Sequence, residues 1–220
     1  RSTLFPYTTL FRSRDKDVLI DNLKFFGNLY PNAGYGGRFI RWLAQKSPEP
    51  YGSWANGSAM RVSPCAWVAS SLSEAQDLAR LSAVVTHNHP EGIKGALATS
   101  DAIYLARKGS DKSEIKEHVE SNYGYDLSRS FDEIQPDYSF DVSCAGSVPE
   151  SIICFLEADD FEDTIRNAVS MGGDADTMAA IAGSIASAYW DVPKTISNKA
   201  IDYLDEVLLD VFISFEDLMY

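Results

Sequence analysis

Cysteine, histidine and basic residues are scarce in this chain of 220 residues, and each shortage excludes a class of site. The three cysteines are an odd number and include no CxxC spacing, so neither a disulfide framework nor a zinc site is supported. Nineteen basic residues stand against 32 acidic ones, and the net charge of −13 repels nucleic-acid phosphates and anionic membranes. We therefore expect no nucleic-acid or membrane partner and a reducing, cytoplasmic location.

Long apolar runs, repeats and linkers are also missing. No segment approaches the roughly 20 apolar residues that cross a bilayer, and no secretory signal opens the chain. Hydrophobic residues make up 45% and charged residues 23%, which is the balance of a globular protein. Length and composition together predict a single soluble domain, and the acidic surface suits a site that holds cations.

Residues 1–13, RSTLFPYTTLFRS, differ from everything that follows. They contain no acidic residue, although the remainder is strongly acidic, and they resemble a translated sequencing-library adapter. We interpret them as a non-native scar and expect the domain to occupy residues 14–220. The alternative is a genuine β-prone N-terminal strand.

Helical periodicity dominates the remainder. One segment, residues 175–190, is apolar on every side and is expected to lie in the centre of the fold. Residues 128–143 are polar and predict an extended loop. The pattern predicts an all-α, single-domain protein. Helices are predicted over residues 17–30, 39–44, 73–85, 94–107, 111–123, 148–157, 161–169, 175–190 and 197–210.

The segment GGDADT places Asp174, Asp176 and Thr177 at the mouth of that apolar helix, directly after two glycines. The glycines allow a sharp turn and the close approach of a ligand. A set of oxygen donors suits a hard cation, Mg²⁺ or Mn²⁺, better than zinc. The alternative is a helix start, with one aspartate as N-cap and the other favoured by the helix dipole.

Two of the three histidines, His87 and His89, fall in the segment THNHPEG between predicted helices. One of them could hydrogen-bond a ligand or transfer a proton. The alternative is a loop in which both histidines cap neighbouring helices.

A third segment combines small residues, a turn signal and one aromatic ring. Its backbone amides could approach a phosphate or ribose, and its tryptophan could stack on a base. The alternative is an ordinary loop, and Arg61 just after it could hold a buried ion pair as readily as touch a substrate. The residues are Gly52, Ser53, Trp54, Ala55, Asn56, Gly57 and Ser58.

Taken together and in this order, the segments resemble the ADP-ribosylglycohydrolase family, which includes the dinitrogenase-reductase-activating glycohydrolases, and the bacterial branch looks most similar. The likeness extends from about residue 23 to the C-terminus. The segments that carry it are GYGGRFIRWL, YGSWANGSAMRVSP, THNHPEGIKGALATSDAIYLAR and CAGSVPESIICFLEADDFEDTIRNAVSMGGDADTMAAIAGSIASAYW.

The resemblance implies an orthogonal helical bundle with two Mg²⁺ ions in a central cleft. It implies hydrolysis of the glycosidic bond between ADP-ribose and an acceptor, with ADP-ribose or an ADP-ribosylated protein as partner of a monomer. By the family pattern Asp174, Asp176 and Thr177 would be metal ligands, while the 52–58 loop and His87 would contact ADP-ribose. The loop at residues 34–37 would lie beside the cleft.

Two departures from the family pattern matter. Family members open with a GDxxG-like stretch and a threonine followed by two aspartates, which supply the other half of the metal shell, and nothing before residue 23 matches these. We therefore expect a truncated domain that lacks its N-terminal helix, a half-built metal site, impaired activity, and an unidentified catalytic acid or base. Ala55 stands where the family usually has glycine.

Three rival functions remain. A module of the same fold could bind ADP-ribose without cleaving it. A haloacid-dehalogenase-like phosphohydrolase could use DADT, but that chemistry needs an apolar strand before the first aspartate, where this chain has two glycines after a helical segment. A purely structural relative would need no metal ligands, so the intact Asp174, Asp176 and Thr177 argue against it.

Overall fold

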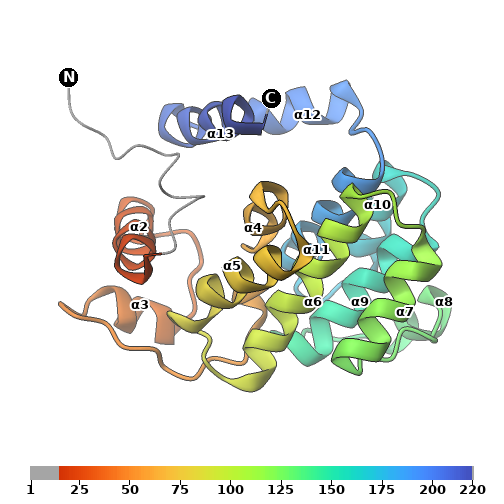
Figure 1. Cartoon of the computed structure of the whole chain (residues 1–220), viewed down its shortest axis with the longest axis horizontal. Helices are drawn as coiled ribbons and strands as arrows, with labels where there is room; N and C mark the ends of the chain where they lie inside the picture. The colour runs from red at the N-terminus through yellow and green to blue at the C-terminus, as the bar shows by residue number, and fades with distance from the viewer. Residues whose placement is uncertain (1–14, 220) are drawn as a thin grey trace.

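The computed structural model describes residues 15–219, and the prediction of an all-α fold is confirmed there (Figure 1). Within that range β pairing is limited to one isolated bridge between Ala55 and Ser143. The prediction of a scar over residues 1–13 lies outside the described residues. The helices are α2 (Lys16–Leu29), α3 (Gly37–Leu43), α4 (Ser63–Val68), α5 (Leu72–Val84), α6 (Pro90–Arg107), α7 (Lys112–Tyr123), α8 (Phe131–Ile134), α9 (Cys144–Glu157), α10 (Phe161–Met171), α11 (Ala175–Tyr189), α12 (Lys194–Ile201) and α13 (Glu206–Met219), with 3₁₀ turns η1 (Asn56–Ser58) and η2 (Gln135–Asp137).

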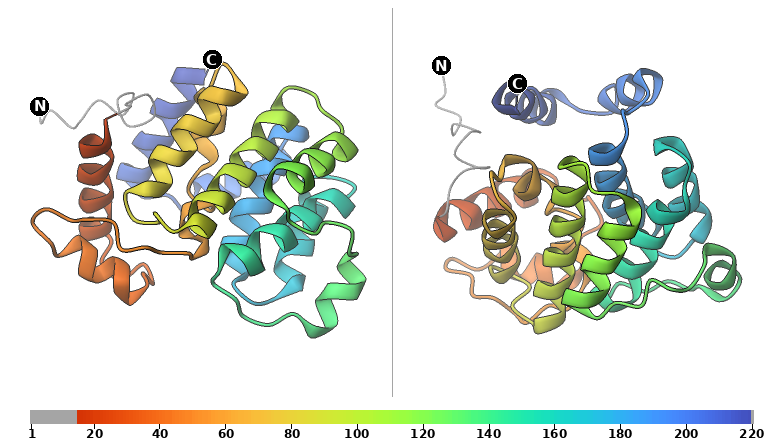
Figure 2. Two further views of the ribbon diagram at one scale, coloured as in Figure 1. Left: turned by 60° about the horizontal axis from the view of Figure 1, so that its bottom comes forward. Right: turned by 45° about the vertical axis from the view of Figure 1, so that its right-hand side comes forward.

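Helix α6 is the centre of the fold, and it packs against α4, α5, α7, α9 and α11. Both views of Figure 2 show it running through the middle of the body. Small residues let its neighbours approach closely, since a Cβ atom added to Gly95 would lie 2.5 Å from Cys144 Sγ on α9. This contact fixes α9, whose first turn carries part of the candidate site, against α6.

Helix α11 packs against α6, α9 and α10, which confirms the predicted central position of the apolar segment. Its side chains Met178, Ile181 and Ile185 have no exposed surface. A Cβ atom on Gly183 would lie 2.8 Å from Ile165 Cδ1, so the two helices approach closely where α10 crosses. The core therefore holds the first turn of α11, with Asp174 and Asp176, in a fixed place.

Most helix starts follow local capping chemistry that the sequence displays. The N-cap side chains of Ser71, Asp111, Ser143 and Asp160 each accept a hydrogen bond from a backbone N–H of the following first turn. Such a cap contributes about 1 kcal/mol to helix stability. These caps explain why the predicted starts of α5, α7 and α10 lie within a residue or two of the observed ones.

Two element predictions were wrong. The single helix expected over residues 197–210 is two helices, because Asp205 accepts a hydrogen bond from Leu208 N at 3.0 Å and starts α13 as a new helix. The loop expected over residues 128–143 contains α8 and η2, since Ser130 and Glu133 form a reciprocal capping box. In both places a local hydrogen bond between a side chain and a backbone amide starts a helix that the wider sequence pattern did not indicate.

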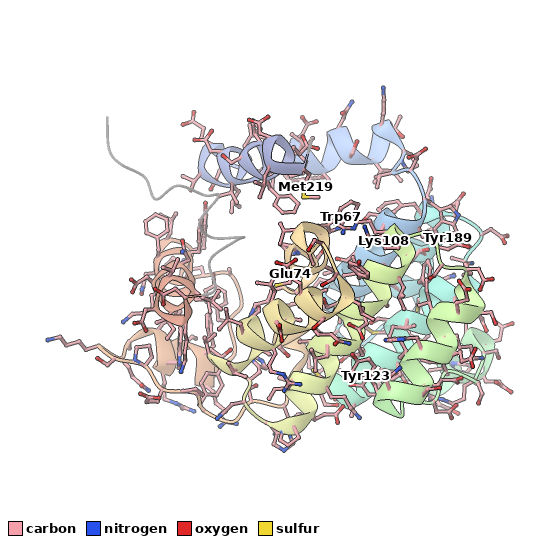
Figure 3. The ribbon with its side chains drawn as sticks, viewed as in Figure 1. Trp67, Glu74, Lys108, Tyr123, Tyr189 and Met219 are labelled. Atoms are coloured by element: carbon pink, nitrogen blue, oxygen red, sulfur yellow. The ribbon has the colours of Figure 1, made fainter. Side chains whose placement is uncertain are left out.

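A buried carboxylate ties α5, α6 and α7 together. Asp101 on α6 has no exposed surface, and its Oδ2 accepts hydrogen bonds from Gln76 Nε2 at 2.9 Å, His118 Nε2 at 2.8 Å and the hydroxyl of Tyr123. Tyr123 is labelled in Figure 3. Because a buried carboxylate without partners is costly, these donors hold the three helices in one arrangement.

The helices at the two ends of the described chain lie at the margin of the body. Figure 1 shows α2 and α3 at one edge and α12 and α13 along another. Neither α12 nor α13 contains a buried residue. Within the described range no helix has both the length and the hydropathy required to cross a bilayer.

Candidate functional site

The 52–58 loop is clamped between two other segments of the chain. On one side Gly52 N donates to Asn88 Oδ1 at 2.7 Å. On the other side Asn56 N donates to Val142 O at 2.8 Å and Cys144 N donates to Trp54 O at 3.0 Å. The loop thus joins the His87 segment to the first turn of α9.

Asn56 links this loop to the aspartates at the start of α11. Its Nδ2 donates to Asp174 Oδ2 at 2.7 Å and to Ser147 Oγ at 3.0 Å. The side chain is buried, so both of its amide hydrogens are used inside the protein. The structure therefore brings together two of the three predicted site segments through a single side chain.

Asp174 occupies the N-cap position of α11 but does not act as a cap. Its side chain makes no capping hydrogen bond, because the carboxylate accepts from Asn56 instead. Asp176 Oδ1 accepts from Thr177 N at 2.9 Å. For Asp174 the alternative of a simple helix start is wrong, and its carboxylate is oriented by tertiary contact.

Gly173 makes the turn before Asp174 possible. It has a φ of +64°, and a Cβ atom there would lie 2.6 Å from Tyr138 Cε1. Tyr138 is fixed because its hydroxyl donates to Gly146 O at 2.8 Å. Helix α10 precedes the glycines, so the apolar strand that haloacid-dehalogenase chemistry requires is absent from this place.

The donor set at the start of α11 fits part of a Mg²⁺ shell. Asp174, Asp176 and Thr177 offer only oxygen, and Mg²⁺ is typically held by one or two carboxylates while it keeps several waters. Within residues 15–219 no group of three or more histidine, cysteine, aspartate or glutamate side chains is placed to hold a metal ion. Asp174, Asp176 and Thr177 could therefore supply part of a Mg²⁺ shell.

The two loop histidines have different roles. His89 is the N-cap of α6 and its Nδ1 accepts from Glu91 N at 3.1 Å, so for this residue the capping alternative is confirmed. His87 is buried, and a Cβ atom on Gly57 would lie 3.3 Å from its Nε2. The THNHPEG segment, through His87, therefore also lies against the 52–58 loop.

His87 is uncharged at neutral pH. Burial, together with the nearby positive charges of Arg61 and Arg38, lowers the pKa of its imidazole to about 3. A neutral imidazole offers one donor and one acceptor to its surroundings. His87 is thus suited to hydrogen bonding with a ligand and is not a cationic partner for a phosphate.

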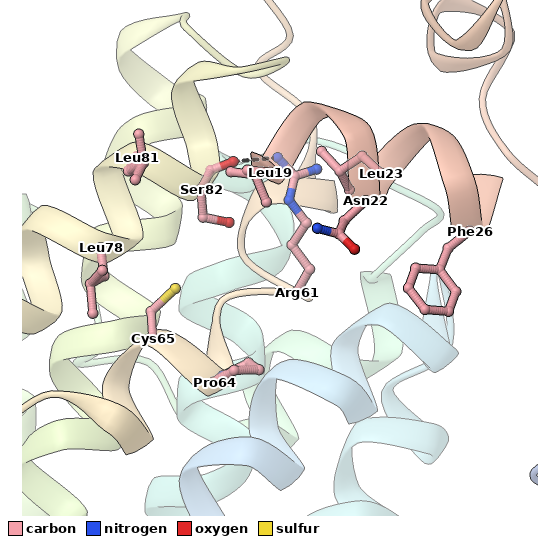
Figure 4. Close-up of a pocket in the computed structure, with 10 residues that line it drawn as sticks. All are labelled: Leu19, Asn22, Leu23, Phe26, Arg61, Pro64, Cys65, Leu78, Leu81 and Ser82. Atoms are coloured by element: carbon pink, nitrogen blue, oxygen red, sulfur yellow. Dashed lines mark hydrogen bonds between the residues drawn. The ribbon is translucent and has the colours of Figure 1, made fainter. Parts of the chain in front are cut away.

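Arg61 does not hold the buried ion pair that its sequence context left open. It donates to Ser82 O at 2.6 Å and to Thr86 Oγ1 at 2.9 Å, and it makes no salt bridge with a described carboxylate. Figure 4 shows it lining an apolar pocket of about 210 Å³ between α2, α4 and α5. Burial lowers the pKa of Arg61 to about 10, so it stays charged at neutral pH.

Trp54 and Ala55 lie side by side in the 52–58 loop, one exposed and the other in an ordinary backbone conformation. The Trp54 side chain is 45% exposed on the loop, and no other described ring packs against it. Ala55 has a φ of −75°, an extended conformation open to any residue, so its methyl group adds no backbone strain. Four neighbours that the sequence did not single out also line the site: Met60, Thr86, Tyr138 and Ser147.

Comparison with known proteins identifies the family of this chain. The family model for ADP-ribosylglycohydrolases matches residues 14–217, and the chain belongs to this family. It is 28% identical over 219 residues to mouse ADP-ribosylhydrolase ARH3, and 29% identical over 206 residues to the human protein of that name. These alignments cover 73% and 72% of this chain but 59% and 57% of the two relatives. The chain thus spans a little over half the length of the curated relatives it matches.

A second line of similarity concerns the fold. A solved structure described as an "ADP-ribosylglycohydrolase-related protein complex" superposes with a TM-score of 0.73 at 23% sequence identity, covering 98% of this chain and 78% of the other. An archaeal protein from Archaeoglobus fulgidus is 31% identical over 147 residues, or 60% of this chain. The helical arrangement is therefore shared well beyond closely related sequences.

Proposed function

We propose that this chain is a glycoside hydrolase that cleaves the bond between ADP-ribose and an acceptor, using divalent metal bound at Asp174, Asp176 and Thr177. The proposal is supported by family membership and by the similarity to proteins named ADP-ribosylhydrolase. Its substrate would be an ADP-ribosylated protein or a related ADP-ribose compound, and the chain would act as a monomer in the cytoplasm.

One observation carries the proposal: two distant segments, residues 86–87 and the start of α11, both contact the 52–58 loop. Asn56 contacts Asp174, Gly57 faces His87, and Ser53 N donates to Thr86 O at 3.3 Å. Such convergence is unnecessary for a loop that only connects helices. It supports a site in which the carboxylates at the start of α11, the 52–58 loop and the imidazole of His87 would act on one ligand.

Each side chain would have a defined part in the reaction. Asp174, Asp176 and Thr177 would hold Mg²⁺, which supplies charge stabilisation and orients water when bound. The 52–58 loop would contact ADP-ribose, and Trp54 would stack on the adenine ring. The group that protonates the leaving atom or activates water is unassigned.

The test is calorimetric titration of ADP-ribose, with and without Mg²⁺, into the wild-type chain and into Asp174→Ala/Asp176→Ala. Metal-dependent binding that is lost in the double variant supports the proposed site. Release of ADP-ribose from ADP-ribosylated protein, followed under the same conditions, then tests hydrolysis. Binding that is equal in both chains would contradict the assignment of these aspartates.

A second candidate is a module that binds ADP-ribose without hydrolysing it. It is favoured by the partial ligand set, since within the described range no cluster of three potential ligands is present. The two functions differ in their response to chelation. Binding that survives EDTA, together with absent release of ADP-ribose, would favour the binding module.

A further inference from the structure

Arg61, Thr86 and His87 form a row of hydrogen-bonding groups next to the 52–58 loop. Arg61 Nη2 donates to Thr86 Oγ1 at 2.9 Å, and Thr86 Oγ1 lies 2.7 Å from His87 Nδ1. Thr86 has no exposed surface, and His87 keeps only 5%. None of these contacts involves the aspartates at the start of α11.

The proton count along this row fixes the direction of each hydrogen bond. A guanidinium can only donate, so Thr86 Oγ1 accepts from Arg61. If His87 Nδ1 also donated to Oγ1, the hydroxyl proton of Thr86 would be left without an acceptor, because the described residues offer it no other partner. Such a buried unpaired donor is unfavourable. The hydroxyl therefore donates to Nδ1, which must be the unprotonated nitrogen.

The imidazole ring is neutral in this environment, so its single proton is on Nε2. The charged and titratable groups near the ring are Arg61, Arg38 and Tyr51, whose ring centroid lies 6.2 Å from that of His87. Both arginines oppose a second proton on the imidazole. In this row the unprotonated Nδ1 faces Thr86, and the N–H faces away from it.

The Nε2–H group is directed at the 52–58 loop. A Cβ atom on Gly57 would lie 3.3 Å from Nε2, so the nitrogen faces the backbone of the 52–58 loop. Within the described part of the chain Nε2 makes no hydrogen bond. Glycine at position 57 keeps the space in front of this donor open.

We propose that Arg61 and Thr86 are positioning residues that hold His87 as a neutral Nε2–H donor for an acceptor atom of the ligand at the 52–58 loop. The identification of the acceptor as an oxygen of ADP-ribose rests on the proposed function. The tautomer of His87 does not depend on it. In this arrangement Arg61 influences ligand binding through its hydrogen bond to Thr86 and does not contact the ligand itself.

Nitrogen-15 NMR of the histidine rings in the full chain without ligand tests the tautomer. The chain has three histidines, so His87, His89 and His118 can be assigned by substitution. We expect the wild-type His87 ring to show a protonated Nε2 and an unprotonated Nδ1. Thr86→Ser, which keeps the hydroxyl, should retain this pattern, and Thr86→Val should move the ring towards a mixture of tautomers. A wild-type proton on Nδ1, or identical spectra for Thr86→Val and wild type, would overturn the proposal.

Calorimetry with ADP-ribose tests the positioning role. Thr86→Val should weaken binding by about tenfold, and Thr86→Ser should remain within about twofold of wild type. Unchanged His118 signals, from the buried Asp101 cluster, report that the variants are folded. A changed tautomer with unchanged affinity would overturn the positioning role. If wild type binds no ADP-ribose, the proposed function fails while the NMR result still decides the tautomer, and the wild-type spectrum decides it alone if Thr86→Val does not fold.

Discussion

Asn56 and Asp174 lie 118 residues apart in the sequence, and the amide of the first donates to the carboxylate of the second at 2.7 Å. The Asp174 side chain makes no capping hydrogen bond to α11. The remaining hydrogen of the same amide goes to Ser147 Oγ on α9. The bond thus couples the 52–58 loop to α9 and α11 and sets the orientation of Asp174.

Replacing Asn56 should disturb the metal site, although Asn56 is not one of the residues proposed to coordinate the metal. Asn56→Ala removes the donor that orients Asp174, and loss of such a supporting hydrogen bond typically costs about 10–100-fold in metal affinity or activity. We expect Mg²⁺-dependent ADP-ribose binding to weaken by that order in calorimetry. Ser147→Ala is the matched control, because it leaves the Asn56–Asp174 bond in place. Equal losses in the two variants would show that orientation of Asp174 is not the cause.

Gly173→Ala should destabilise the fold and displace Asp174. A left-handed conformation costs a non-glycine residue about 1–2 kcal/mol, and the close approach of Tyr138 adds an overpacking cost of about 1–3 kcal/mol. Gly124→Ala is the control, because its φ of +65° nearly equals the +64° of Gly173 while no atom lies within 4 Å of the added Cβ. Urea denaturation should show the larger loss for Gly173→Ala. Similar losses of unfolding free energy in the two variants would mean that the ring of Tyr138 moves aside at no measurable cost.

His87 should make the fold sensitive to mild acid. Its pKa is about 3 in the folded chain, because of burial and then Arg61 and Arg38, against about 6.5 when unfolded. Only the unfolded chain takes up this proton between those values, so stability is full above pH 6.5 and falls as the pH drops towards 3. Between pH 6.5 and 5 this single group should cost roughly 1–2 kcal/mol.

The measurement is urea denaturation of wild type and His87→Gln at several pH values between 5 and 7.5. The variant should lose less stability with falling pH than wild type, even if it is less stable at pH 7.5. Parallel curves for the two chains would contradict a buried, neutral His87.

Trp54→Ala should weaken ADP-ribose binding but leave the fold intact. Stacking of a base on an aromatic side chain is worth about 1–3 kcal/mol, so we expect a loss of roughly tenfold or more in affinity by calorimetry. The side chain is 45% exposed, and surface substitutions usually change stability by less than about 0.5 kcal/mol. Tyr203→Ala, an aromatic residue 79% exposed between α12 and α13, is the control and should bind normally. Normal binding by both variants would exclude Trp54 from the base site.

The sequence could predict features that depend on neighbouring residues. Asp111 and Glu114 form a capping box within one turn, so the start of α7 was predictable to a residue. The central place of α11 followed from its apolar composition. The break at Asp205 was missed, because the wider apolar pattern of residues 197–210 gave no sign that its side chain would start a new helix.

The site shows the same division. The sequence by itself determined the three chemical segments, the oxygen-only donors of GGDADT and the membership of a family whose motifs it carries. Only the tertiary structure decided that Asp174 accepts from Asn56, and that His89 caps a helix while His87 faces the loop. The physical reason is range: capping and periodicity act over a few residues, whereas these contacts form where the packing of α6, α9 and α11 brings distant segments within hydrogen-bonding distance.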